Sequence, residues 1–79
     1  MTAGQFVLSK CGRDKGQLFV VLMVDGEYLY LVNGTSRPLS KPKKKKCKHV
    51  QPTNANAGSM GTDAEIRKNI RAIVDGCGT

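Results

Sequence analysis

The segment of residues 4–24 constrains the fold most, because it places two apolar stretches on either side of a short glycine-bounded break. In the first stretch apolar and polar residues roughly alternate, with Val7 as the exception, as in a strand with one buried face. The second stretch is apolar throughout from Leu18 and rich in β-branched and aromatic residues, which favours a buried strand. Between them lies Gly12-Arg13-Asp14-Lys15-Gly16, whose glycines permit positive φ at both ends of a turn. We therefore expect strands over about residues 5–10 and 17–24, joined by a loop that exposes Arg13 and Lys15.

Turn-forming residue pairs predict further strands downstream. Asp25-Gly26 is a strong hairpin signal, and residues 27–32 after it are apolar on both faces, as expected when a short curved sheet closes on itself. Asn33-Gly34 predicts a second turn. A short strand is expected near residues 37–40, where Pro38 restricts it to an edge or to irregular geometry. A last strand around Lys46–Val50 would help to close a barrel of about five strands.

The C-terminal part predicts a linker and a helix. Residues 51–61 are small and polar, as in a linker. Thr62-Asp63-Ala64-Glu65 is a capping-box pattern, and Gly76 is a candidate C-cap. An apolar stripe follows the cap at helical spacing: Ile66, Ile70, Ile73 and Val74. We expect a barrel with a basic tail over residues 1–50, a linker over 51–61 and a helix over 62–76. The helix docks on the barrel by default, with a partner protein as the alternative.

The positive charge is concentrated in one segment. The 79 residues carry 13 basic and six acidic side chains, and seven of the basic ones lie between residues 37 and 48 with no acid among them. The rest of the chain is therefore neutral, with six of each sign. A basic segment on a neutral domain indicates a polyanionic partner, most commonly nucleic acid. Five neutralised phosphates would give a log–log salt slope of about −3.5 to −4.5.

Other classes of function find little support in the sequence. No nucleophile–base pair or paired carboxylates can be assembled, so we expect no enzyme activity and no cofactor. The three cysteines lack C-x-x-C spacing, which argues against a structural zinc site. No apolar signal region stands at the start and no run approaches a membrane span, so we expect a reduced, cytoplasmic protein without membrane or small-molecule partners.

Candidate nucleic-acid contacts follow from this charge distribution, which does not by itself distinguish RNA from DNA. Arg13 is suited to a bidentate contact with a phosphate or to stacking on a base. Tyr28 and Tyr30 are expected to be packed rather than to stack on bases, and a partly buried His at a strand end is the simpler interpretation of His49. The complete set of candidates is Lys10, Arg13, Lys15, Arg37, Lys41, Lys43, Lys44, Lys45, Lys46, Lys48 and His49.

Two motifs resemble a known family. Gly4-Gln5-x-Val7-x-Ser9-x-x-Gly12-Arg13-Asp14-Lys15-Gly16, followed by an apolar strand, resembles the KOW motif. With the downstream Arg37-x4-Pro42-Lys43-Lys44-Lys45-Lys46-x-Lys48-His49, the chain looks like KOW-domain RNA-binding proteins of Gram-positive bacteria, particularly clostridia. These are similar to a large-subunit ribosomal protein family of archaea and eukaryotes. The resemblance covers about residues 4–50, with the helix a looser match, and Pro38 departs from the pattern in the fourth-strand region.

The resemblance implies a small SH3-like barrel that binds RNA, most simply ribosomal RNA, with ribosomal proteins as further partners. We therefore expect a non-enzymatic, ribosome-associated protein of translation that holds RNA phosphates through residues 12–16 and 43–48. An SH3- or tudor-like protein-interaction module and a transcription-elongation-type KOW module contacting polymerase are the alternatives.

Overall fold

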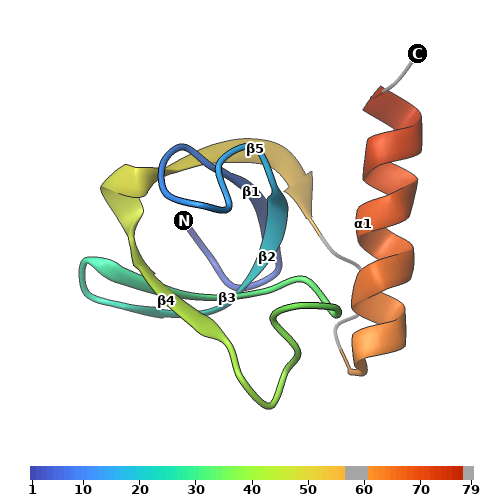
Figure 1. Cartoon of the computed structure of the whole chain (residues 1–79), viewed down its shortest axis with the longest axis horizontal. Coiled ribbons are helices and arrows are strands. Elements are labelled where there is room, and N and C mark those ends of the chain that lie inside the picture. The colour runs from blue at the N-terminus through green and yellow to red at the C-terminus, as the bar shows by residue number, and fades with distance from the viewer. Residues whose placement is uncertain (57–60, 78–79) are drawn as a thin grey trace.

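The computed structural model describes residues 1–56 and 61–77, with side chains to Ile73, and shows a mainly β protein with one C-terminal helix (Figure 1). Five strands form one antiparallel sheet in the order β4-β3-β2-β1-β5. The elements are β1 (Gln5–Ser9), β2 (Leu18–Asp25), β3 (Tyr28–Val32), β4 (Lys43–Lys46), the 3-10 turn η1 (Cys47–His49), β5 (Val50–Asn56) and α1 (Asp63–Cys77).

The first three strands lie where the sequence predicts them. Asp25 pairs with Tyr28 across the β2–β3 ladder, so the tight turn is formed by Gly26 and Glu27. Gly26 has a φ of +60°, which glycine adopts without steric cost. The glycine-bounded loop behaves in the same way, with φ of +88° at Gly12 and +87° at Gly16.

The middle of the chain differs from the expected strand pattern. Residues 37–40 form no strand but belong to a loop that continues to β4. The Asn33 side chain organises this loop, because its Oδ1 accepts hydrogen bonds from the backbone N–H groups of Thr35 (3.0 Å) and Arg37 (2.9 Å). Asn33-Gly34 therefore begins a long loop rather than a tight hairpin.

The lysine run itself forms the fourth strand, and the fifth strand comes later than predicted. The expected strand over residues 46–50 is instead the end of β4 followed by η1. β5 occupies residues 50–56, the first half of the expected linker, whose residues 57–60 lie outside the described part of the chain. Pro52 is tolerated because β5 pairs with β1 on one side and lies at a sheet edge.

The short connection between β4 and β5 requires the sheet to curve. These strands are the two edges of the sheet, and five strands in a flat sheet would separate its edges by about 19 Å. Even fully extended, the chain from Lys46 to Val50 spans at most about 14 Å. The sheet therefore bends around its inner face, as its course in Figure 1 shows.

Each face of the sheet has its own apolar core. The inner cluster comprises Val7, Phe19, Val21, Leu29, Leu31 and Val50, with Cys47 packed against it. The outer cluster comprises Phe6, Val20, Val32 and Ile66, with Leu18, Leu22, Leu39, Ala55, Ile70 and Ile73 around it. Both faces of the sheet are apolar because α1 covers part of the outer one. The helix thus docks on its own sheet through Ile66, which is fully buried.

The start of α1 is capped and bonded to the loop of residues 33–42. Thr62 Oγ1 accepts from Glu65 N–H (3.2 Å), as predicted, whereas Glu65 Oε2 accepts from Gly61 N–H (3.0 Å) rather than from Thr62. Asp63 Oδ1 accepts from the N–H of Leu39 (2.8 Å). The helix continues through Gly76 to Cys77, so the predicted C-cap at Gly76 is wrong, and the Val74 side chain lies outside the described residues.

Candidate nucleic-acid interface

The alternation of side chains along β4 divides the lysine run between two faces. Lys43 lies opposite Leu31 and Lys45 opposite Leu29, and both leucines belong to the inner core. Lys44 and Lys46 lie on the outer face. Four identical residues therefore have two different environments, which the sequence alone does not reveal.

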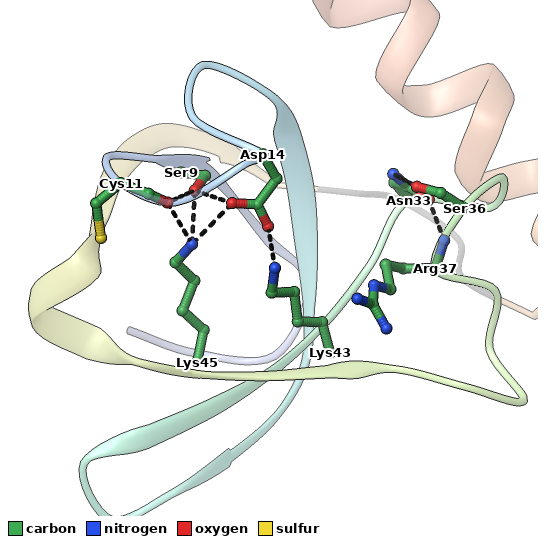
Figure 2. A network of polar contacts seen from close by, with 8 residues as sticks. All are labelled: Ser9, Cys11, Asp14, Asn33, Ser36, Arg37, Lys43 and Lys45. Atoms are coloured by element: carbon green, nitrogen blue, oxygen red, sulfur yellow. Dashed lines mark hydrogen bonds and ion pairs between the residues drawn. The ribbon is translucent and has the colours of Figure 1, made fainter.

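Lys45 is buried and bonded to the glycine-bounded loop (Figure 2). Its Nζ donates to Asp14 Oδ1 (2.9 Å), Ser9 Oγ (2.8 Å) and the carbonyl oxygen of Cys11 (2.8 Å). Ser9 Oγ lies 2.8 Å from the same carboxylate oxygen and donates to it. Lys45 thus uses all three of its N–H donors inside the protein, and it fixes the loop to β4.

Lys43 supplies a second charge to Asp14. Its Nζ lies 2.6 Å from Asp14 Oδ2 in an ion pair, and the Lys43 side chain is 27% exposed. Burial alone would raise the pKa of Asp14, but the bonds from Lys43, Lys45 and Ser9 and the charge of Lys45 outweigh it. Together they hold the pKa of this carboxyl well below its usual range. Asp14 therefore stays ionised, and the cluster of Asp14, Lys43 and Lys45 keeps a net positive charge.

An open depression of about 340 Å³ adjoins this cluster. Cations from three separate segments line it: Arg13 from the glycine-bounded loop, Arg37 from the loop after β3, and Lys43 from β4. The Arg37 side chain extends back towards Lys43 (Figure 2). The remaining lining residues are Asp14, Gln17, Phe19 and Ser36. The depression thus combines two exposed guanidinium groups with the Lys43–Asp14 ion pair and with polar side chains.

The structure does not bring all the predicted contact residues together. The depression is shared by Arg13, Arg37 and Lys43. Two other candidates lie side by side, because the backbone N–H of Lys10 donates to the backbone carbonyl of His49 (2.9 Å). Lys44 and Lys46 lie on the outer face, and Lys45 is withdrawn into the protein. Lys10, Lys15, Lys41 and Lys48 are exposed, while His49 is partly buried.

Sequence reasoning overlooked the residues that position the cations. A solvated turn would pair Asp14 with a neighbouring residue, but its two cationic partners lie on β4, about thirty residues away. The sequence likewise does not predict that Ser9, a polar residue of β1, is almost fully buried. Two features of the sequence could have indicated this cluster. One is a single acid in a glycine-bounded loop, and the other is a lysine run whose side chains would alternate between two faces if it formed a strand.

Comparisons with known proteins leave the chain without an assigned family. No protein-family model matches it, and a search of curated proteins finds no significant relative. Within the described residues, no three metal-ligating side chains are grouped to hold an ion, and no helix is long and apolar enough to cross a bilayer. The function is therefore inferred from the geometry of the site.

Proposed function

We propose that this protein is a non-enzymatic RNA-binding protein of the KOW type that associates with ribosomal RNA. The observation that carries the proposal is the convergence of Arg13, Arg37 and Lys43 on one open depression. Guanidinium groups match phosphate geometry with paired N–H donors, and lysine adds a point charge. Exposed Lys15 lies in the same loop as Arg13, and Lys41 lies between Arg37 and β4.

The proposed fold is an SH3-like barrel. The strand order and the four-residue step from β4 to β5 support it, because they bring the two sheet edges towards each other. A curved sheet of this kind holds the glycine-bounded loop and β4 in a fixed relation through the bonds of Lys45. The loop that carries Arg13 is therefore positioned before binding, which favours affinity.

The test removes the two arginines of the depression. Arg13→Gln with Arg37→Gln should weaken binding to ribosomal RNA at least about tenfold, because two phosphate contacts are lost. Lys68→Gln with Arg71→Gln is the matched control, since these exposed residues of α1 remove the same charge elsewhere. Affinity would be measured by filter binding, and ribosome association by gradient co-sedimentation.

The control separates a site from a general charge effect. Equal loss in both double variants would mean that net charge alone attracts RNA, and the assignment of the depression would be wrong. A wild-type protein that stays in the free fractions at low salt would contradict ribosomal RNA as the partner. Replacing the whole lysine run is a poor test, because Lys45 is buried and its loss would destabilise the fold as well as remove charge.

A further inference from the structure

The outer face of the β3–β4 ladder carries a second set of chemically related side chains. Tyr28 lies opposite Lys46 and Tyr30 lies opposite Lys44, so two aromatic rings and two ammonium groups alternate on one surface. Lys44 Nζ lies 4.5 Å from the centroid of the Tyr28 ring, and Lys46 Nζ lies 5.8 Å from it. These are cation–π distances, so the ammonium groups of both lysines lie over the Tyr28 ring.

This surface is not the part of the outer face that α1 covers. The residues that pack with α1 belong to the cluster around Phe6, Val20 and Val32. In Figure 1 β4 lies away from the helix, with β2 and β3 between them. Both tyrosines are half-buried, and Met23, which pairs with Tyr30 across the β2–β3 ladder, is 50% exposed. An aromatic and apolar strip thus continues from β3 onto β2.

We infer that this surface binds the unpaired nucleotides of the RNA, with bases stacked against Tyr28 and Tyr30. On binding, Lys44 and Lys46 turn from the Tyr28 ring onto the adjacent phosphates. Single-stranded RNA is recognised through aromatic platforms flanked by basic groups, and bases stack on such rings with little sequence preference. Charge complementarity selects a polyanion on the β4 side, whereas exposed Asp25, opposite Tyr28 on β2, disfavours phosphates on the other side. This inference depends on the proposed RNA binding and adds the class of RNA: a strand with accessible bases.

The absence of tryptophan makes the surface directly observable. The chain contains two tyrosines and no tryptophan, so its intrinsic fluorescence comes from the two rings of this surface. An oligouridylate of about twelve nucleotides, long enough for one small domain, should quench this fluorescence on binding. Polyphosphate, which has charges but no bases, should bind at low salt without quenching. N-acetyltyrosinamide titrated with the same oligouridylate corrects for absorption by the bases.

A substitution separates stacking from charge. Tyr28→Leu should reduce affinity for the oligouridylate about five- to tenfold, since one base–aromatic contact is lost, and should leave binding to a fully paired RNA duplex within about twofold. Tyr28→Phe keeps the ring and should bind like the wild type. Equal effects on single strand and duplex, or equal quenching by oligouridylate and polyphosphate, would overturn the inference. The wild-type quenching experiment decides the matter even if Tyr28→Leu fails to fold.

Failure of the stacking inference can be distinguished from failure of the proposed RNA-binding function. Duplex affinity reports on phosphate contacts and should fall with Arg13→Gln and Arg37→Gln. The preference for single strand over duplex reports on the tyrosines and should persist in that double variant. Loss of the preference in Tyr28→Leu therefore supports the stacking surface independently of the depression.

Discussion

At the scale of single residues, neighbouring lysines of the same strand have opposite roles. Lys45 is 8% exposed and makes three hydrogen bonds, whereas Lys44 is exposed beside a tyrosine. The composition of the run predicted a polyanion-binding segment, but it carried no information about which lysine would be internal. That depends on Asp14 and Ser9, which lie far away in the sequence and reach β4 only through the folded sheet.

Substituting adjacent lysines tests this division. Lys45→Gln should destabilise the protein by about 3 kcal/mol, because it removes a charge partner from a buried carboxylate. Lys44→Gln should cost less than about 1 kcal/mol, since an exposed cation–π contact contributes little. Urea unfolding followed by far-UV circular dichroism measures both. Similar costs for the two variants would contradict the inside–outside assignment.

Asp14 should make stability depend on pH in the acid range. Its pKa is lowered in the folded protein, so its contribution to stability is complete above the unfolded value of about 3.9 and declines as the pH falls through and below that value. Asp14→Asn lacks this contribution at every pH. The difference in unfolding free energy between wild type and Asp14→Asn should therefore be constant above about pH 5 and shrink at lower pH. Asp25→Asn is the exposed control, and a pH-independent difference for Asp14→Asn would refute the assignment.

At the scale of elements, the loop after β3 and the start of α1 fit together at Gly34. A Cβ on Gly34 would lie 2.5 Å from the Asp63 carbonyl oxygen and 2.8 Å from Arg67 Cγ, and Gly34 has a φ of +76°. Arg67 Nη1 also donates to the Gly34 carbonyl at 2.6 Å. The sequence predicted a turn at this glycine from its local pattern. The close approach of the helix is a tertiary feature that local patterns do not contain.

Gly34→Ala should therefore cost more than the same change at another left-handed glycine. Gly16→Ala, at a φ of +87° with no atom within 4 Å of the added Cβ, should cost only the backbone penalty of about 1–2 kcal/mol. Gly34→Ala adds a clash with backbone and should cost at least about 1 kcal/mol more, in the range of overpacking. Thermal and urea unfolding of the pair provide the comparison. Equal losses would show that the helix start moves freely away from the loop.

The helix itself shows what periodicity can and cannot predict. The stripe of Ile66, Ile70 and Ile73 predicted an amphipathic helix, and the structure confirms it with Ile66 fully buried. The sequence favoured docking on the chain's own sheet, with a partner protein as the alternative, and the packing of Ile66 with Phe6, Val20 and Val32 confirms the first. The linker predicted over residues 51–61 is wrong for its first half, which forms most of β5. Pro52 and the polar residues around it are typical of loops, but an edge strand accepts them as well.

Ile66→Ala measures how much the helix contributes. A fully buried isoleucine truncated to alanine should cost about 2–5 kcal/mol, because a cavity remains under the helix. Arg71→Ala on the exposed side of α1 should change stability by less than about 0.5 kcal/mol. A cost for Ile66→Ala as small as that of Arg71→Ala would indicate that α1 is not packed on the sheet in solution.

At the scale of the whole molecule, the excess charge is spread over several surfaces rather than presented as one block. Arg13, Arg37 and Lys43 face the depression, Lys44 and Lys46 face outward, and Lys45 is internal. The sequence correctly predicted a mainly β chain with a C-terminal helix. The distribution of the cations around it follows from strand alternation and long-range ion pairing, which composition does not encode.

Salt dependence should reveal how many cations contact the RNA. Each lost phosphate contact reduces the magnitude of the log–log salt slope by about 0.7–0.9, so Arg13→Gln with Arg37→Gln should reduce it by about 1.4–1.8. Lys68→Gln with Arg71→Gln should leave the slope unchanged. Binding isotherms at several salt concentrations give these values, and an unchanged slope in the first double variant would remove the arginines from the RNA interface.

A strand made of four identical residues contains little sequence information that could fix its register against the neighbouring strand. A shift of β4 by one position would still leave lysines at three of its four places, so residue identity does little to fix the register, and the ion pairs of Lys43 and Lys45 with Asp14 favour the observed one. For the same reason, a chain with one additional lysine in the run can keep every contact of β4 and pass the extra residue into the loop before it. A longer run should thus be tolerated by the fold, whereas a change at Asp14 should be costly.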